Sequence, residues 1–259
     1  MKIDEIRRVD REVKSWLSES RKRVLTEMKS RLVVNTKTGR RDLVTNVDKA
    51  NEHFLVDKIR SYDPGSKILG EEGLGDQVTS SKGQVWIVDP IDGTMNFVKQ
   101  RNHFAIMIAL YENGQGILGY IFDVLGNKLY SGGPDLGVFE YDRKTSMDKN
   151  YSLADGLIGL CGLMVLSNEY YVDSVSRMSL GMRIYGSAGI DIISVLKGEL
   201  VGYISHLKPW DFGAGKILLE TNGFKISSID GQPLDMLSST TVLLGTPNAH
   251  RDVLTIVSQ

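Results

Sequence analysis

The sequence predicts a mixed α/β fold built in two halves. Between residues 83 and 141, short apolar segments alternate with glycine-containing turns, which is typical of a sheet of short strands. From about residue 157 onward, strand-like apolar segments alternate with helix-like ones, which indicates layered helices and strands. The polar stretch DRKTSMDKNYSLADG separates the two regions. We therefore expect an N-terminal half over residues 1–143 and a C-terminal half over residues 144–259.

The N-terminal half begins with two predicted helices. An amphipathic helix is indicated by apolar residues at three- and four-residue spacing: Ile3, Ile6, Val9, Val13, Trp16 and Leu17. A polar loop, VNTKTGRRD, follows it. Thr45 or Asn46 can cap the second helix, and Asp63-Pro64-Gly65 stops it. The predicted strands come next, as VWIVD, HFAIMIALYEN, GILGYIFDVLGN, KLYSGG and GVFEYD.

The C-terminal half starts with the apolar run LIGLCGLMVL, which we interpret as one strand with Cys161 buried inside it. The helix NEYYVDSVSRMS, the strand GMRIYG, the helix GIDIISVLKGE and the strand VGYIS are predicted to follow. The remaining elements are a helix FGAGKILLETNG ending at Gly223, the strands FKISSI and TVLLGT, and a terminal helix from Asn248.

Composition excludes several classes of partner. The 31 basic and 32 acidic residues of this 259-residue chain nearly cancel, so no global charge favours nucleic acid or an anionic membrane. The single cysteine cannot form an internal disulfide, which suggests a reducing compartment. The first thirty residues carry charges throughout, and no later stretch has the apolar length of a membrane span. We expect a cytoplasmic protein with no nucleic-acid or membrane partner.

The segment WIVDPIDGTMNF places two carboxylates, Asp89 and Asp92, at the end of a buried-looking strand. Taken alone, Asp89 could simply form a turn beside Pro90. Gly93-Thr94, however, opens the next predicted helix, whose free N–H groups favour an anion. Two like charges and an anion repel one another in one pocket unless a cation lies between them. The segment therefore predicts a divalent metal.

Further oxygen ligands are available elsewhere in the chain. Glu71 and Glu72 lie in GEEG after an apolar strand-like segment, and Asp211 lies in PWDFGAG at the start of a predicted helix. Asp42 and Asp48 flank LVTNV. Each has an ordinary explanation as a solvated surface acid or a helix-start carboxylate. Together they form an oxygen-only set without histidine, which points to Mg²⁺ or Mn²⁺ rather than zinc.

With GEEG, WIVDPIDGTMNF and PWDFGAG in this order, the sequence resembles the inositol monophosphatase family of Mg²⁺-dependent, lithium-sensitive phosphomonoesterases. The resemblance covers nearly the whole chain and includes DLVTNVD and GSAGIDI. It implies a layered α/β/α/β/α sandwich of the sugar-phosphatase type. The N-terminal half then carries an antiparallel sheet and most metal ligands, and the C-terminal half contributes Asp211 and the substrate-side wall. The resemblance also implies a homodimer and a small phosphorylated metabolite as substrate.

By the same resemblance, the metal ligands can be assigned to this sequence. Glu71, Asp89 and the backbone carbonyl of Ile91 match a first metal site. Asp89, Asp92 and Asp211 match a second site, and Glu71 with waters matches a weaker third one. The family pattern implies two or three Mg²⁺ ions, with Mn²⁺ as a substitute and Li⁺ as an inhibitor.

The resemblance also assigns catalytic and substrate-binding residues. Asp48 and Thr94 match the pair that orients the attacking water, and Glu71 is counted with them as catalytic. The phosphate and substrate contacts are assigned to four residues: Gly93, Thr94, Ser187 and Ala188. Lys37 precedes Asp42 in a loop and matches a residue that approaches the site when metals bind, while Glu72 matches an acid behind the ligands. The implied chemistry is metal-assisted in-line displacement at phosphorus.

The substrate is where the sequence departs from the family. Inositol-selective members carry a glutamate six residues before the Trp-Asp pair, and Ile204 stands there in this chain. Ser205 and Lys208 are polar neighbours, and a lysine close to the pocket would favour a substrate with a second anionic group. Glu199 is an acid that a local shift could bring into the gap. We expect hydrolysis of inositol 1-phosphate-like esters with relaxed specificity. The alternatives are NADP 2′-phosphatase or fructose-1,6-bisphosphatase as main activity and, more distantly, a two-metal nuclease or a non-catalytic metal-binding protein.

Overall fold

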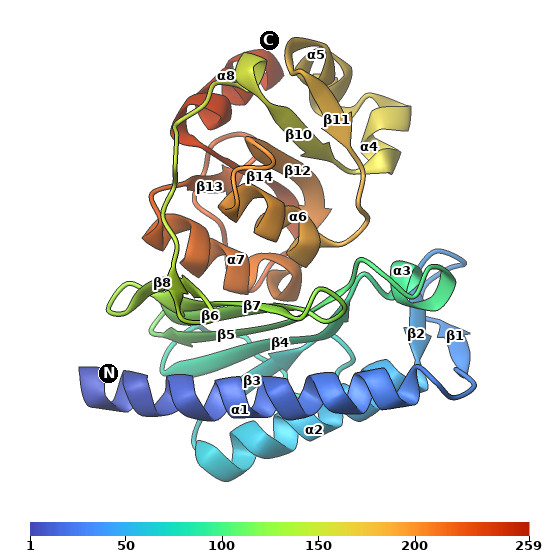
Figure 1. Ribbon diagram of the computed structural model, residues 1–259, viewed down its shortest axis with the longest axis vertical. Coiled ribbons are helices and arrows are strands. Elements are labelled where there is room, and N and C mark those ends of the chain that lie inside the picture. The colour runs from blue at the N-terminus through green and yellow to red at the C-terminus, as the bar shows by residue number, and fades with distance from the viewer. Residues whose placement is uncertain (259) are drawn as a thin grey trace.

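Helices and sheets alternate in five layers along the long axis of the computed structural model, which describes residues 1–258 (Figure 1). The three helical layers are α1 (Ile3–Glu27) with α2 (Asn46–Tyr62), then α6 (Ala188–Leu196) with α7 (Pro209–Thr221), then α4 (Gly162–Ser167), α5 (Val172–Met178) and α8 (Pro247–Val257). One sheet lies on each side of the middle helical layer. The arrangement confirms the expected α/β/α/β/α sandwich.

The sheet of the N-terminal half is mainly antiparallel. Within residues 1–258 it has seven strands in spatial order: β3 (Lys67–Gly70), β4 (Gln84–Asp92), β5 (Ala105–Glu112), β6 (Gln115–Asp123), β7 (Lys128–Gly133), β8 (Gly137–Glu140) and β9 (Arg143–Lys144). Only β3 and β4 pair in parallel within it. A separate hairpin pairs β1 (Val34–Thr36) with β2 (Leu43–Thr45), and the short helix α3 (Thr94–Lys99) follows β4.

The sheet of the C-terminal half is mixed. In the part of the chain that the structure describes, its five strands lie in the order β11 (Gly181–Arg183), β10 (Leu157–Leu160), β12 (Gly202–Leu207), β14 (Thr240–Gly245) and β13 (Lys225–Ser228). β10 is parallel to β11 and β12, whereas β14 is antiparallel to both of its neighbours. The 3₁₀ turns η1 (Leu153–Asp155) and η2 (Glu169–Tyr171) lie in the connections.

The predicted strand LIGLCGLMVL is wrong beyond Leu160. β10 ends there, and Cys161 is the half-buried N-cap of α4 rather than a buried strand residue. Met164 is buried while Leu163 and Leu166 are exposed, as the helical period requires. A continuous apolar run does not distinguish a short strand from a helix by periodicity. The predicted helix NEYYVDSVSRMS likewise divides into η2 and α5.

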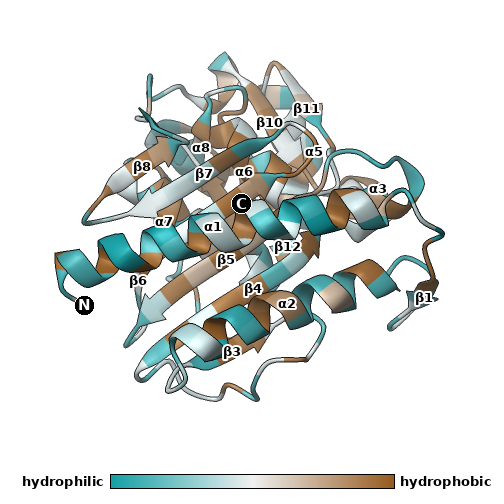
Figure 2. Cartoon of the chain, turned by 60° about the horizontal axis from the view of Figure 1, so that its bottom comes forward, coloured by the Kyte–Doolittle hydropathy of each residue, from teal (hydrophilic) through white to brown (hydrophobic). Residues whose placement is uncertain are grey.

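The first two helices form as predicted. The apolar stripe of α1 is buried from Ile6 to Leu17, and Figure 2 shows hydrophilic and hydrophobic residues alternating along this helix. Trp16 packs against Trp86 of β4, with ring centroids 6.1 Å apart. Of the two candidates for the α2 cap, Thr45 is the one used, because its side chain accepts hydrogen bonds from Val47 and Asp48 N–H. No helix within residues 1–258 combines the length and apolar character needed to cross a bilayer.

The middle helices join the two halves. α7 belongs to the C-terminal half but packs on β4, β5 and β6, and one hydrophobic cluster contains residues of both sheets. Gly119 of β6 permits this contact, because a Cβ atom there would lie 2.5 Å from the carbonyl oxygen of Ala214. This packing brings the first turn of α7 to the end of β4. The division into halves at residues 143 and 144 stays a prediction.

Candidate active site

A bulge at the end of β4 brings Asp89 and Asp92 to one face of the sheet. Side chains three positions apart in a regular strand point to opposite faces. Here Asp89 pairs with Met107 and Asp92 with Ala105, so β4 carries one extra residue over this step. Pro90 lies in the bulge, where its missing N–H costs no ladder bond. The Ile91 N–H donates to Asp89 Oδ1 at 3.0 Å and holds that carboxylate in place.

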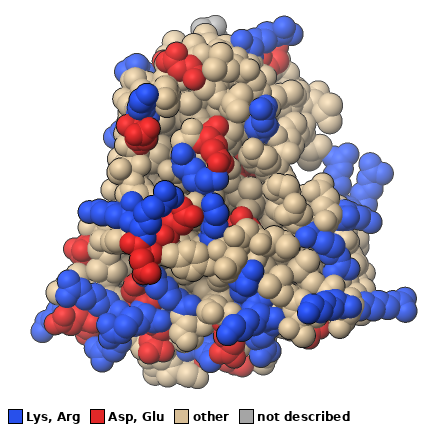
Figure 3. All heavy atoms as spheres, in the orientation of Figure 1, with Lys and Arg blue, Asp and Glu red and all other residues tan. Residues whose placement is uncertain are grey.

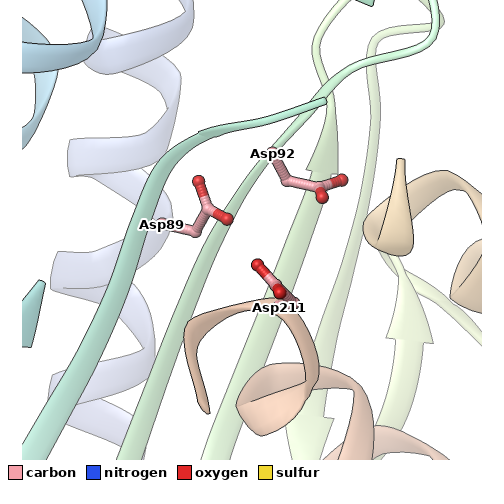
Figure 4. A group of neighbouring side chains, drawn as sticks. All are labelled: Asp89, Asp92 and Asp211. Atoms are coloured by element: carbon pink, nitrogen blue, oxygen red, sulfur yellow. The ribbon is translucent and has the colours of Figure 1, made fainter. Parts of the chain in front are cut away.

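Asp211 approaches the same point from the opposite side. It lies in the first turn of α7, where its Oδ2 accepts a hydrogen bond of 2.8 Å from the Lys208 N–H. Asp89, Asp92 and Asp211 each offer an oxygen within 4.8 Å of the others. Figure 4 shows the three side chains converging from β4 and α7. The chain thus brings together carboxylates that are up to 122 positions apart, from Asp89 to Asp211.

Burial and mutual repulsion disfavour the charged forms of the three carboxylates. Burial and the charges of Glu71, Asp92 and Asp211 raise the pKa of Asp89 well above its ordinary value. Burial raises the pKa of Asp92 to about 6, and burial with the charge of Asp92 raises the pKa of Asp211 to about 8. Such a group of buried carboxylates is stable when protons or cations neutralise it. An all-oxygen, highly anionic donor set fits hard divalent cations such as Mg²⁺.

The two glutamates of GEEG, Glu71 and Glu72, form ion pairs with Lys37. The Lys37 Nζ lies 2.8 Å from Glu71 Oε1 and 2.6 Å from Glu72 Oε1. Although burial acts in the other direction, these carboxylates raise the pKa of Lys37. Lys37 follows β1, and its N–H donates to the carbonyl of Asp42 at 2.8 Å. Asp42 itself accepts from the Thr38 hydroxyl, so it shapes the hairpin rather than joining the converging carboxylates.

Asp48 and Thr94 form a hydrogen-bonded pair beside the bulge. The Thr94 hydroxyl lies 2.9 Å from Asp48 Oδ1 and 3.0 Å from the Ile91 carbonyl oxygen, and either can accept its one proton. The other oxygen of Asp48 accepts from the Thr45 N–H at 2.9 Å and from the Thr45 hydroxyl. Burial raises the pKa of Asp48 while these bonds lower it. The capped start of α2 therefore fixes the carboxylate that faces Thr94.

Gly93 and the start of α6 close one side of the site. Gly93 has φ of 86°, and a Cβ atom there would lie 2.9 Å from the Cβ of Ser187, so both backbone and space require glycine. The Ser187 hydroxyl donates to Asp92, as do the N–H groups of Ala188 at 3.0 Å and Gly189 at 2.8 Å. These donors are thus occupied by Asp92. The phosphate and substrate contacts of Gly93, Ser187 and Ala188 stay predictions.

Sequence reasoning missed two buried residues on α2. The Asn51 side chain donates to the Pro90 carbonyl at 2.8 Å and accepts from the Ser20 hydroxyl at 2.6 Å. Glu52 accepts from the Glu72 N–H at 3.1 Å and so anchors the GEEG turn. Both lie three or four positions after Asp48, on one face of the helix. The sequence signal for them is their spacing, because Asn51 and Glu52 lie on the helix face that also carries the buried Leu55.

Asn51→Ala is expected to destabilise the protein and weaken its Mg²⁺ response, because the Pro90 carbonyl in the bulge loses its donor. Leaving a buried acceptor unpaired costs about 1–3 kcal/mol in unfolding free energy. Chemical denaturation and the Mg²⁺ concentration for half-maximal activity would measure the two effects. Ser20→Ala is the matched control, since it removes the outer bond and keeps the one to Pro90. Equal Mg²⁺ requirements in Asn51→Ala and the control would contradict this role.

A cavity of about 250 Å³ adjoins the carboxylates on the C-terminal side. Its lining includes Asp92 and Asp211 together with Ser187, Asp191, Tyr203 and Ser205. Ile204 is not part of it, because alternate residues of β12 face opposite sides and Ile204 is fully buried against Ile158 and Leu243. The position of the family glutamate is therefore turned away, and Ser205 faces the cavity instead.

The other polar candidates near this gap do not fill it. Glu199 is exposed and forms an ion pair with Lys197, so the expected alternative in which Glu199 enters the pocket is not observed. The Lys208 ammonium lies 5.2 Å from the centre of the Trp210 ring, and Lys208 does not line the cavity. The structure thus gives no support to Lys208 as a partner for a second anionic group.

Known proteins resemble this chain over nearly its whole length. The model of the inositol monophosphatase family matches residues 3–259. The chain is 38% identical over 250 residues to an inositol-1-monophosphatase of Bacillus subtilis, covering 95% of this chain and 94% of the relative.

Two solved structures show the same fold. A crystal structure described as IMPase/NADP phosphatase complexed with Mg²⁺ and phosphate superposes with a TM-score of 0.90 at 30% identity, covering 97% of this chain and 95% of the other. A lithium-soaked inhibitory complex of staphylococcal inositol monophosphatase-1 gives a TM-score of 0.90 at 29% identity, with 97% and 94% covered. With the matched family model and the converging carboxylates, these likenesses identify the chain as a member of the inositol monophosphatase family.

Proposed function

We propose that the chain hydrolyses small phosphate monoesters of the inositol 1-phosphate type with Mg²⁺ and with relaxed specificity for the leaving group. Family membership makes it a phosphoric monoester hydrolase that acts on a small phosphorylated metabolite. The observation that carries the proposal is the convergence of Asp89, Asp92 and Asp211 beside the Asp48–Thr94 pair. Relaxed specificity is supported by Ile204, which faces away from the cavity.

The side chains can be given roles in an in-line displacement. Bound at Asp89, Asp92, Asp211, Glu71 and the Ile91 carbonyl, Mg²⁺ would supply the Lewis-acid chemistry that activates water and stabilises the leaving oxygen. If the Ile91 carbonyl holds a metal ion, the Thr94 hydroxyl would donate its hydrogen bond to Asp48, and the Thr94 oxygen could then accept a hydrogen bond from the attacking water. Gly93 and Thr94 present backbone N–H groups to the phosphate, and the leaving group extends into the 250 Å³ cavity.

The metal requirement follows from the same ligands. We propose two Mg²⁺ ions and a third, more weakly bound ion held by Glu71. This third ion competes with Lys37 for the Glu71 carboxylate. Mn²⁺ should substitute, because it accepts the same oxygen ligands. The likeness to a Mg²⁺ complex and to a lithium-inhibited complex supports Mg²⁺ dependence and inhibition by Li⁺ here.

A panel of kcat/KM values tests the substrate assignment. We expect activity on inositol 1-phosphate and comparable activity on NADP, fructose 1,6-bisphosphate and 3′-phosphoadenosine 5′-phosphate. A preference for inositol 1-phosphate above about a hundredfold, roughly 2.7 kcal/mol of transition-state binding, would contradict relaxed specificity. A dominant NADP 2′-phosphatase activity is the second candidate, because a structure described as IMPase/NADP phosphatase covers 97% of this chain. Nuclease activity on single-stranded DNA, or no turnover at all, would instead favour the distant alternatives.

We also propose a homodimer formed through the outer face of α4 and β11, in a cytoplasmic protein. Within residues 1–258, β11 pairs only with β10, so its outer edge is unpaired. Large exposed apolar side chains gather there: Leu163, Leu166, Leu180, Met182 and Ile184. Leu166 is 84% exposed and Leu180 70%, and the surface over α4 in Figure 3 is mostly uncharged. Such a patch on a chain with otherwise interspersed charges suits a second copy.

Sedimentation velocity would check the dimer. The parent protein is expected to be dimeric at micromolar concentration, whereas Leu166→Glu with Leu180→Glu should be monomeric because charges enter the apolar contact. Leu125→Glu, at an exposed leucine outside α4 and β11, is the matched control. A monomeric parent protein would contradict the proposal.

A further inference from the structure

Asp191 is a buried carboxylate at the wall of the cavity. It lies in the first turn of α6 and is only 1% exposed. Among the described residues, its Oδ1 has no hydrogen-bond partner. Burying a carboxylate without a partner is costly, and such groups in native proteins usually have a functional or ligand-related reason.

The surrounding chain makes room for this carboxylate. Gly159 of β10 lies directly against it, and a Cβ atom at Gly159 would lie 2.6 Å from Asp191 Oδ1 and 2.9 Å from Cδ2 of Tyr203. Any larger residue would therefore push Asp191 or Tyr203 aside. The absence of a side chain at Gly159 therefore leaves the space that the Asp191 carboxylate occupies.

The cavity has metal ligands at one end and Asp191 as its remaining acid. Of the carboxylates that line it, Asp92 and Asp211 belong to the converging cluster, and Asp191 does not. Tyr203 and Ser205 of β12 line the cavity with it. A phosphate bound at the cluster would place its leaving group in this space, beside Asp191.

We propose that Asp191 is a specificity-determining residue that accepts a hydrogen bond from a hydroxyl of the leaving group. The inference rests on the proposed phosphomonoesterase function and assigns Asp191 to the recognition of the leaving group. β12 offers no carboxylate, because Gly202–Leu207 contains neither aspartate nor glutamate, and Ile204, at the position of the family glutamate, faces the opposite side of the sheet. A single acceptor on α6 can bind one hydroxyl of many different leaving groups. Selecting inositol would need contacts to several hydroxyls, so this role is compatible with relaxed specificity.

A two-substrate comparison tests this role. Inositol 1-phosphate and cyclohexyl phosphate share a six-membered ring and differ in the ring hydroxyls. We expect the parent protein to prefer inositol 1-phosphate by kcat/KM. Asp191→Asn should lower kcat/KM for inositol 1-phosphate about tenfold, mainly through KM, because the lost hydrogen bond is made in ground and transition states alike. For cyclohexyl phosphate the change should stay within about threefold, since no hydroxyl is present.

The control is Ser194→Ala. Ser194 lies one turn further along α6, and its buried hydroxyl donates to the Ile190 carbonyl. It should leave the preference unchanged. Equal losses on both esters in Asp191→Asn, or no loss on inositol 1-phosphate, would overturn the inference. If Asp191→Asn does not fold, the parent protein decides, because equal kcat/KM values for the two esters would also overturn it. No Mg²⁺-dependent turnover of either ester by the parent would overturn the proposed function, and the inference with it.

Discussion

Asp89→Asn is expected to abolish turnover at saturating Mg²⁺ and to stabilise the metal-free protein. Asp89 is the acid shared between both proposed metal positions, and loss of about 4 kcal/mol of charge stabilisation lowers the rate about a thousandfold. Its amide can keep the bond from the Ile91 N–H, because only Oδ1 of Asp89 receives it. Removing one buried charge from the cluster then relieves repulsion from Glu71, Asp92 and Asp211. Turnover, Mg²⁺ calorimetry and thermal unfolding in EDTA would measure these effects.

The stability difference should depend on pH. The pKa values of Asp89, Asp92 and Asp211 are raised in the folded state, so the native protein binds these protons more tightly than the unfolded chain. The contribution of these three groups to metal-free stability is therefore greatest below the ordinary aspartate pKa of about 4 and falls as the pH rises through the folded values, about 6 for Asp92 and about 8 for Asp211. Asp89→Asn should flatten this decline. A parent protein whose melting temperature in EDTA rises between pH 5 and pH 8 would contradict the explanation.

Asp92→Asn is the informative companion variant. It should lose turnover as well, but it should not gain stability. Both oxygens of Asp92 accept hydrogen bonds, from Ser187, Ala188 and Gly189 at the start of α6. An amide must turn its own N–H toward at least one of these donors, and the unpaired buried group costs about 1–3 kcal/mol. Near-normal activity of Asp92→Asn at saturating Mg²⁺ would contradict the assigned metal site.

Asp48→Asn is expected to lower kcat by about 10²- to 10⁴-fold, the usual range for a group that controls a proton in the transition state. With its carbonyl oxygen kept toward Thr45, the new amide would donate to Thr94. The Thr94 oxygen would then accept a hydrogen bond from this amide instead of one from the attacking water. Mg²⁺ affinity should change little, because Asp48 is not among the converging carboxylates.

Two threonine variants separate this role from a structural one. Thr94→Ala should lose activity as Asp48→Asn does, whereas Thr94→Ser keeps the hydroxyl and should keep most of the activity. Single-turnover rates at saturating Mg²⁺ would compare them. Activity of Asp48→Asn within about threefold of the parent would remove Asp48 from the water-orienting pair, since general acid–base groups contribute far more than that.

Local sequence determined much of the fold and the ligand set. Short-range rules suffice for the α1 stripe, for the Thr45 cap and for the strands of the first sheet, because each depends on neighbours in the chain. The metal chemistry was also readable, since an acidic, histidine-free set of motifs at strand and helix ends favours a hard cation whatever the exact geometry. The family resemblance then assigned roles that residue types alone left open.

Tertiary structure decided which side chains meet. The bulge at Pro90 turns Asp89 and Asp92 to one face, and the packing of α7 on β6 through Gly119 brings in Asp211. Strand alternation turns Ile204 away from the cavity, and a helix from a different part of the chain supplies Asp191. Side-chain direction depends on strand register, bulges and long-range packing, and not only on the spacing of residues in the sequence. For that reason the sequence determined what this protein can bind and the chemistry it can use, while only the folded chain decided which residues surround the leaving group.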